Sequence, residues 1–200
     1  MLGILRRIFR AFTWDEPPRR PSPPTVPERA IKKPALSAAD TLAILDDLPR
    51  AKVVRVQDGD TLIVAKGWNQ TTIRLDSIDC PEDGQPWGNI AKAGLIKLVG
   101  GRNVALEEHG VDPHGRTLAT IYVWQANRNE WLNVNERMVT LGHAWVMRIY
   151  YDHLPKDRQT KLNHLEGWAK SNKVGLWRTE NPIPPWQWRK QRSSSQSAGE

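Results

Sequence analysis

The residues with the clearest capacity for chemistry are acidic side chains beside two short β-rich segments. Residues 58–60 are Asp-Gly-Asp and residues 79–82 are Asp-Cys-Pro-Glu. Cleavage of a phosphodiester needs a cation on the phosphate oxygens, a base that deprotonates or orients water, and positive charge where the transition state gathers negative charge. Asp60 and Asp79 offer hard oxygen ligands for a divalent cation. Pro81 turns the chain so that Glu82 can point back as the base.

Two arginines complete this candidate set. Arg74 lies in an expected strand, and Arg116 follows the Asp-Pro-His-Gly turn at 112–115. A guanidinium can bind two phosphate oxygens at once, so both suit a negatively charged transition state. Each motif has a plainer interpretation when taken alone, because Asp-Gly-Asp-Thr is more often a hairpin turn and a strand arginine usually pairs with a surface acid.

A hairpin is expected to bring the carboxylates together. The composition predicts strands over 52–57, 61–66 and 71–77, with a loop at 67–70. If the chain turns around residues 68–69, paired positions sum to about 137, so Asp60 faces roughly Ser77 and Asp79 lies just beyond. Strict alternation would put Arg74 and Asp79 on opposite faces, so the strand must bulge or end before Asp79.

The remaining elements favour a small mixed barrel. Helical spacing is seen at 88–99, 134–141 and 156–171, and further strands are expected at 103–108 and 118–124. Strands packed closely, with helices between and after them, indicate an α+β, β-rich fold rather than βαβ repetition.

The composition limits the class of protein. The 200 residues carry 29 Lys+Arg against 22 Asp+Glu, a net charge of +7, which favours a polyanionic partner. The lone Cys80 excludes a disulfide framework and multi-cysteine metal sites. No apolar run is long enough to cross a bilayer as a helix.

The ends of the chain differ from its centre. Residues 1–14 form a cationic amphipathic segment, for which a membrane-surface anchor, an organelle transit peptide and a misassigned start all stay open. No secretory signal is recognised, so we expect a membrane-associated or cytoplasmic protein. Next come a proline-rich linker at 15–36, a short helical lead-in at 37–50, the folded domain at 51–188 and a disordered tail at 189–200.

The folded part resembles the thermonuclease, or staphylococcal nuclease-like, family over about 51–188. The motifs that carry the resemblance are Val-Gln-Asp-Gly-Asp-Thr at 56–61, Ile-Arg-Leu at 73–75, Ile-Asp-Cys-Pro-Glu at 78–82, Gln-Pro-Trp-Gly at 85–88, Asp-Pro-His-Gly-Arg at 112–116, Val-Asn at 134–135, Gly-His-Ala-Trp-Val at 142–146 and Gly-Leu-Trp at 175–177. The ending Pro-Ile-Pro-Pro-Trp-Gln-Trp-Arg at 182–189 resembles bacterial members in particular.

This resemblance implies a five-stranded OB-fold barrel with packed helices, and a calcium-dependent phosphodiesterase acting on DNA and RNA. We expect the protein to be a monomer whose partner is nucleic acid, as single-stranded DNA, RNA or duplex DNA. The resemblance matches Asp60 and Asp79 to the Ca²⁺ carboxylates, with the Cys80 backbone carbonyl completing the metal shell. It matches Glu82 to the general base, and Arg74 and Arg116 to the pair that stabilises the transition state. Attack by water would release the 5′ oxygen and leave a 3′-phosphate.

The departures fall at substrate contacts. His114 stands where a tyrosine is common, Arg148 stands where another tyrosine is frequent, and Tyr150 aligns with an aromatic of the nucleotide pocket. These three are the substrate-binding candidates. His109 and His114 are expected to be solvated loop histidines rather than zinc ligands, since an all-oxygen shell favours Ca²⁺.

Two further expectations complete the sequence analysis. Trp186 and Trp188 are expected to clamp the C-terminal arm onto the barrel rather than to stack on bases. A barrel that only binds nucleic acid or protein is the competing function, and the five retained catalytic side chains argue against it.

Overall fold

A computed structural model describes residues 38–197 of the chain. The expected amphipathic segment at 1–14 and the proline-rich linker at 15–36 lie outside the described residues. Within 38–197, no helix is long and apolar enough to cross a membrane.

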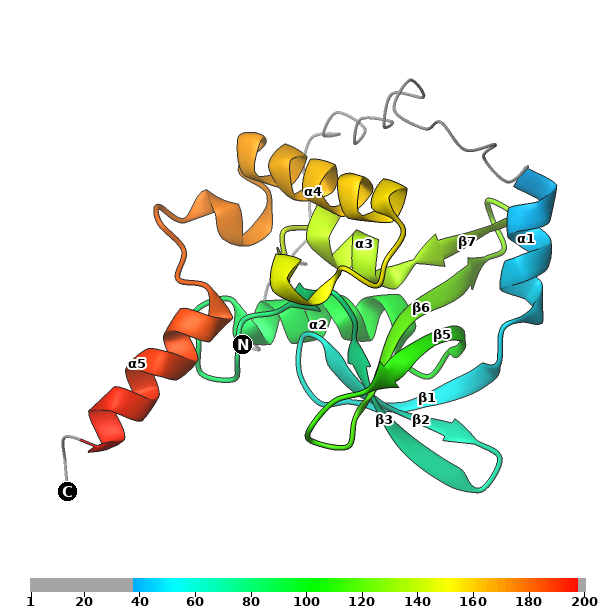
Figure 1. The fold of residues 1–200 in the computed structure, drawn as a ribbon, viewed down its shortest axis with the longest axis horizontal. Helices are drawn as coiled ribbons and strands as arrows, with labels where there is room; N and C mark the ends of the chain where they lie inside the picture. The colour runs from blue at the N-terminus through cyan, green and yellow to red at the C-terminus, as the bar shows by residue number, and fades with distance from the viewer. Residues whose placement is uncertain (1–37, 198–200) are drawn as a thin grey trace, which may run out of the picture.

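The centre of the fold is a closed five-stranded barrel (Figure 1). Its strands, in the order in which they pair, are β3 (Asn69–Leu75), β2 (Thr61–Lys66), β1 (Arg50–Val56), β5 (Asn103–Val111) and β6 (Thr117–Gln125). Parallel pairing of β3 with β6, from Ile73 opposite Thr117 to Leu75 opposite Ala119, closes the circle. Strand β7 (Glu130–Asn133) pairs antiparallel with β6 outside the closed barrel. The α+β, OB-fold barrel expected from the sequence is confirmed.

The β2–β3 hairpin is tighter than expected. Thr61 pairs with Arg74 and Lys66 pairs with Asn69, so only Gly67 and Trp68 form the turn. Gly67 has a φ of +62°, a conformation that glycine adopts without steric cost. The predicted register is therefore wrong by two positions: Asp60 lies opposite Leu75, whose N–H donates to the Asp60 carbonyl at 2.8 Å, and not opposite Ser77.

The chain leaves the barrel between Arg74 and Asp79, as the candidate site requires. Strand β3 ends at Leu75, Ser77 takes a φ of +62°, and a separate short strand, β4 (Ile78–Asp79), then pairs with β8 (Trp145–Val146). Because the chain changes direction at 76–77, strict alternation along one strand no longer separates the two side chains.

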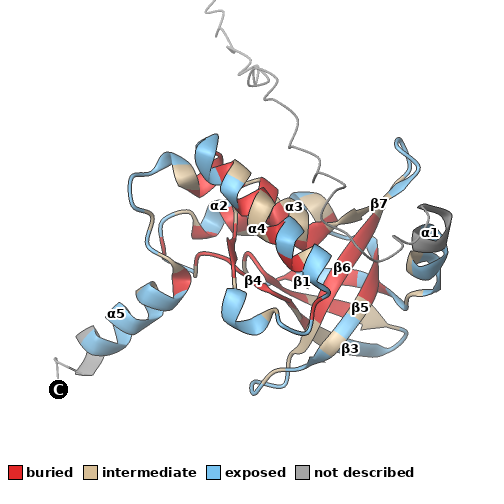
Figure 2. Cartoon of the chain, turned by 45° about the horizontal axis from the view of Figure 1, so that its top comes forward, coloured by how far each residue is buried: buried red, intermediate tan, exposed pale blue. Residues whose placement is uncertain are grey.

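Helices cover one side of the barrel and close its core. They are α2 (Gly88–Val99), α3 (Val134–Thr140) and α4 (Lys156–Ser171), with the short 3₁₀ helices η2 (Arg148–Tyr150) and η3 (Gly175–Arg178) beside them. Figure 2 shows the buried residues concentrated in the barrel strands and on the inner faces of these helices. The core consists of aliphatic side chains such as Leu62, Ile73, Leu95, Ile121 and Met138.

The lead-in helix α1 (Ala38–Asp47) packs near β7. The guanidinium of Arg50 lies 4.3 Å from the ring centroid of Trp131, and the indole N–H of Trp131 donates to Asp46 at 2.9 Å. A cation–π contact and a hydrogen bond thus fix the end of the expected helical segment at 37–50 against the barrel.

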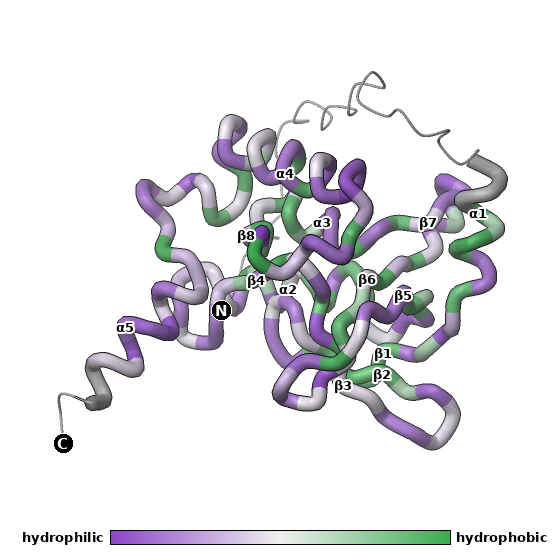
Figure 3. The backbone as a smooth tube through the Cα atoms, viewed as in Figure 1, coloured by the Kyte–Doolittle hydropathy of each residue, from purple (hydrophilic) through white to green (hydrophobic). Residues whose placement is uncertain are grey.

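The C-terminal arm differs from the expected disordered tail at 189–200. Helix α5 (Pro185–Ser197) continues through the expected boundary and projects from the body of the fold (Figure 1). Its surface is largely hydrophilic (Figure 3). Its first turn is held by an aromatic contact, since Trp186 lies 6.4 Å from Trp145 and nearly perpendicular to it. This contact bears out the expected clamp for Trp186. It also fixes the first turn of α5, from which the helix can extend through the polar residues that follow.

Candidate active site

The two carboxylates expected to hold a cation meet at one end of the barrel. Asp60 lies directly before β2, and Asp79 lies in β4. Arg74 joins them: its Nε is 3.2 Å from Asp60 Oδ1 and its Nη2 is 2.8 Å from Asp79 Oδ1. The same guanidinium donates to the carbonyls of Leu75 and Ile78 at 2.7 and 2.8 Å. Arg74 is therefore held rigidly between two acids from distant parts of the sequence.

Asp60 is almost completely buried. One carboxylate oxygen accepts the backbone N–H of Cys80 at 2.7 Å, and the other accepts the hydroxyl of Thr61 at 3.1 Å. Burial raises the pKa of Asp60 to about 7, against the lowering effect of Arg74, and the neighbouring Asp58 and Asp79 raise it further. A nearby positive charge stabilises the ionised form of a carboxylate that is buried in this way.

The turn at 58–60 packs directly on Cys80. A Cβ added at Gly59 would lie 2.6 Å from the Cys80 Cβ, so only glycine fits. The Cys80 thiol contacts the Gly59 carbonyl at 3.2 Å, and burial raises its pKa well above the ordinary value. The neutral thiol is thus a packing group, which leaves the backbone of residue 80 as its contribution to the site.

Arg116 reaches the same end of the barrel from the β5–β6 turn. Its Nη1 lies 3.5 Å from the hydroxyl of Thr61, the residue next to Asp60. Asp112 positions it: one carboxylate oxygen accepts the backbone N–H groups of His114 and Arg116, and the other binds the Arg116 guanidinium at 2.7 and 2.8 Å. Burial would raise the pKa of Asp112, but the hydrogen bonds from Arg116 outweigh it and hold that pKa below its usual value. Sequence analysis missed this role, although an acid four residues before a functional arginine was a usable signal.

Glu82 lies in a tightly packed loop between β4 and α2. Its backbone N–H donates to Gln85 Oε1 at 3.0 Å, and its carbonyl accepts the Gln85 N–H at 3.0 Å. A Cβ added at Gly88 would lie 2.1 Å from that carbonyl, so the start of α2 fixes the loop from the other side. The Glu82 side chain itself is about one-third exposed, as a base that must reach water requires.

Arg189 is a further cation at the site. From α5 it binds the Glu82 carboxylate through Nη1 and Asp79 Oδ2 through Nη2, the latter at 3.0 Å. The expected boundary at 188 excluded this residue from the domain. The signal that could have found it is the basic residue that ends the Pro/Trp-rich segment.

The three substrate-binding candidates have different surroundings. His114 and Tyr150 are exposed, on the β5–β6 turn and on η2 respectively. Arg148 Nη2 instead lies 2.6 Å from Oε2 of the buried Glu166, which also binds Lys170. Arg148 is thus paired with a buried carboxylate of α4, a partner that its position in the sequence did not indicate.

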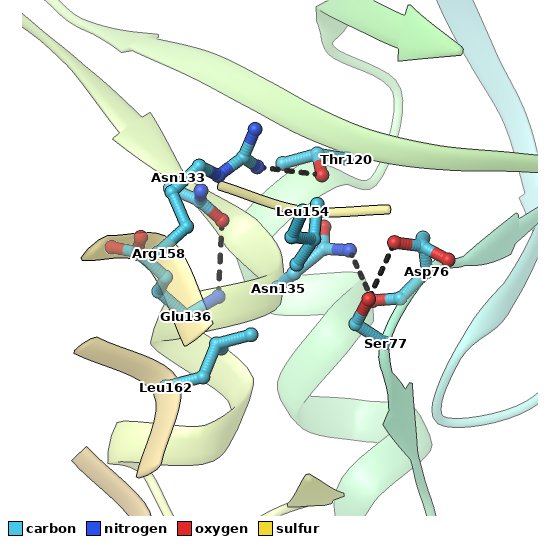
Figure 4. Close-up of a pocket in the computed structure, with 9 residues that line it drawn as sticks. All are labelled: Asp76, Ser77, Thr120, Asn133, Asn135, Glu136, Leu154, Arg158 and Leu162. Carbon is cyan, nitrogen blue, oxygen red and sulfur yellow. Dashed lines mark hydrogen bonds between the residues drawn. The ribbon is translucent and has the colours of Figure 1, made fainter. Parts of the chain in front are cut away.

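A small pocket lies away from these residues. It is lined by Asp76, Ser77, Thr120, Asn133, Asn135, Glu136, Leu154, Arg158 and Leu162 (Figure 4). Asn135 accepts the Ile121 N–H and donates to the carbonyls of Asp76 and Ala119, so it ties α3 to the barrel. None of the sequence-predicted site residues lines this pocket, and its saturated polar contacts fit a structural role.

The donor set at the barrel end suits a hard divalent cation. Asp60 and Asp79 supply carboxylate oxygens, and the backbone of Cys80 runs beside them. The guanidiniums of Arg74 and Arg189 each donate to one oxygen of Asp79. The carboxylate of Asp79 is therefore paired with positive charge on both of its oxygens. Oxygen donors of this kind are those that Ca²⁺ prefers.

Comparison with known proteins identifies the family of this chain. The family model described as "Staphylococcal nuclease homologue" matches residues 72–179. A micrococcal nuclease of Shigella flexneri is 35% identical over 144 residues, which cover 70% of this chain and 80% of the relative. An uncharacterized endonuclease of Haemophilus influenzae is 39% identical over 141 residues, covering 70% and 72%. With this match, and with the closed barrel that carries Asp60, Arg74 and Asp79, the chain belongs to the staphylococcal nuclease homologue family.

Proposed function

We propose that this nuclease hydrolyses DNA and RNA in a calcium-dependent reaction with low sequence specificity. The observation that carries the proposal is the position of Arg74, whose guanidinium lies between Asp60 and Asp79. The likeness to relatives named as nucleases supports phosphodiester hydrolysis as the reaction. The net charge of +7 supports a polyanionic substrate, because basic side chains gain from contact with phosphates in any sequence.

In this proposal Asp60, Asp79 and the carbonyl of Cys80 hold Ca²⁺, which neutralises charge on the phosphate. Glu82 takes a proton from water, and the water oxygen attacks phosphorus. The bond from phosphorus to the 5′ oxygen breaks, and this oxygen takes a proton from solvent, which leaves a 3′-phosphate on one product and a 5′-hydroxyl on the other. Arg74 and Arg116 bind the phosphate oxygens as negative charge builds up on them.

The rigid hold on each arginine supports these roles. Arg74 is fixed by two carboxylates and two carbonyls, and Arg116 is fixed by Asp112. Charged donors that are already oriented cost no reorganisation at the moment of reaction. We place His114 and Tyr150 at the edge of the substrate path, where an imidazole and a phenol ring can contact a base or a phosphate.

The test uses the purified full-length chain with single-stranded DNA and with RNA, first in calcium and then in excess EGTA. We expect cleavage in calcium, none in EGTA, and products that lose a 3′-phosphate on phosphatase treatment. Binding without calcium-dependent cleavage would instead favour the competing function, a barrel that only binds nucleic acid.

A Glu82→Gln variant tests the base. We expect turnover to fall by about 10²- to 10⁴-fold, the usual contribution of a general base, while calcium and substrate binding stay near the wild-type values. Wild-type turnover in this variant would remove Glu82 from the mechanism.

A further inference from the structure

We propose that Arg189 competes with the divalent cation for Asp79, so that the C-terminal helix sets the calcium affinity of the site. This inference rests on the proposed function, since it takes Asp79 as a calcium ligand. In the structure both oxygens of Asp79 are engaged, Oδ1 by Arg74 and Oδ2 by Arg189. A cation that binds this carboxylate lies beside two guanidiniums, and the repulsion between like charges favours withdrawal of one of them.

The surroundings of the two arginines determine which one withdraws. The Arg74 side chain is 14% exposed and also donates to the carbonyls of Leu75 and Ile78. The Arg189 side chain is 48% exposed and binds the carboxylates of Asp79 and Glu82. Withdrawing Arg74 would break its hydrogen bonds to two backbone carbonyls as well as its ion pairs, whereas Arg189 can move into water at little cost. Arg189 is therefore the guanidinium that yields to the cation.

The base of the arm keeps Arg189 close to the site even after it withdraws. Trp186 packs on Trp145, which in turn lies 5.2 Å from Trp177. Gln85 donates to the Ile183 carbonyl at 2.7 Å while its Oε1 accepts the Glu82 N–H. The loop that carries Glu82 and the arm that carries Arg189 are thus joined through one buried glutamine.

This arrangement has a consequence for the substrate. A phosphodiester bound beside Asp79 offers anionic oxygens to a guanidinium that the cation has displaced. The cation displaces Arg189 from Asp79, and the substrate phosphate binds the displaced guanidinium. Cation and substrate would therefore favour each other's binding.

The experiment measures calcium binding by isothermal titration calorimetry without nucleic acid. It compares the wild-type chain with Arg189→Met, which keeps the length of the side chain but removes its charge. The control is Arg192→Met, which removes the same charge from an exposed position on the same helix. We expect Arg189→Met to bind calcium about three- to fivefold more tightly, the upper part of the range for one partly exposed ion pair, and Arg192→Met to stay within about twofold of wild type.

The outcomes separate the two proposals. Calcium binding by the wild type with unchanged affinity in Arg189→Met overturns the competition but leaves the calcium-dependent nuclease intact. Binding that appears only in Arg189→Met supports the competition in its strongest form. If neither chain binds calcium, both proposals fail. Far-UV circular dichroism of each variant confirms that the compared proteins are folded.

A separate cluster carries a second inference. Asp76 follows β3, His109 lies in β5, and His153 lies between η2 and α4, and one possible ligand atom from each lies within 4.8 Å of the others. We infer that these three side chains bind a single divalent transition-metal cation. His109 lies in a strand and is half-buried, not in a solvated loop as the sequence suggested.

The chemistry of this cluster differs from that of the nuclease site. His153 Nε2 lies 2.9 Å from Asp76 Oδ2, and the two imidazole rings are 5.0 Å apart. Two imidazoles and one carboxylate suit Zn²⁺ or Co²⁺ rather than Ca²⁺. A cation here would replace the His109 contact with the Thr120 hydroxyl, which is 3.0 Å long.

The test titrates Zn²⁺ and Co²⁺ into the full chain in excess calcium, which occupies the oxygen site. We expect one bound equivalent and a visible Co²⁺ absorption typical of a four-coordinate site. His153→Gln should weaken binding by at least about tenfold, since even the loss of a group that only supports a metal ligand costs about that much, whereas His114→Gln on the exposed turn should not. Unchanged binding in both His153→Gln and His109→Gln, or no binding by the wild type, would overturn the inference.

Discussion

Protonation of one histidine, His143, should reduce the stability of the folded state as the pH falls. Its ring is half-buried between α2 and the start of β8, where a Cβ added at Gly94 would lie 2.6 Å from the ring. The indole N–H of Trp87 donates to His143 Nδ1 at 3.1 Å, so this nitrogen must carry no proton. Burial, with a smaller contribution from Arg137, lowers the pKa of His143 from 6.5 to about 4.

The sign and size of the effect follow from this pKa. Because the folded-state pKa lies below the unfolded value, the unfolded chain binds more protons between pH 6.5 and 4, and stability is lost as the pH falls through this interval. The full interval corresponds to about 3 kcal/mol, of which about 2 kcal/mol is lost between pH 7 and pH 5.

The assay is urea unfolding followed by far-UV circular dichroism at pH 7, 6 and 5, with EGTA in every sample. His143→Gln removes the titrating group. Between pH 7 and pH 5, the free energy of unfolding of this variant should therefore fall by about 2 kcal/mol less than that of the wild type. His114→Gln, on an exposed turn, is the control and should keep the wild-type slope. Parallel curves for the wild type and His143→Gln would refute the argument.

Three other predictions concern the site and its approach. Asp112→Asn should lower turnover by about tenfold or more with little change in calcium affinity, because Arg116 loses its carboxylate partner; steady-state kinetics with calorimetry would test this, and unchanged turnover would contradict it. Gly59→Ala should destabilise the fold by about 1–3 kcal/mol, since its Cβ would overlap Cys80; a wild-type midpoint in urea would argue against that overlap. We also propose that residues 1–14 contact membrane surfaces: removing them should abolish co-sedimentation with anionic liposomes, and equal sedimentation of both chains would exclude the anchor.

The hairpin shows where sequence patterns lose precision. Alternation and the expected loop at 67–70 indicated two antiparallel strands, but the register depends on how many residues form the turn. A two-residue turn moved the partner of Asp60 from Ser77 to Leu75. The carboxylates still meet, because the chain leaves β3 at 76–77 and returns as β4. Local sequence preferences do not predict this change of direction, because it depends on the pairing of β4 with β8.

Side-chain partners were harder to foresee than side-chain types. Arg148 was expected to face the substrate, yet it pairs with Glu166 from α4, 18 residues further along the chain. Asp112 was expected only in a turn, yet both of its oxygens hold the backbone and guanidinium around Arg116. Such pairs arise from packing between distant elements, and neither spacing nor charge pattern identifies them.

The sequence by itself determined the barrel class and the chemical types at the site, because strand alternation, turn residues and the Asp60, Arg74, Asp79, Glu82 and Arg116 motifs are local features. Only the tertiary structure decided that Arg189 belongs to the site. Its helix reaches Asp79 and Glu82 from more than 100 residues away, because aromatic contacts near its start hold the arm against the barrel. Contacts of this range depend on where packed surfaces place a chain, and that position is a property of the whole fold.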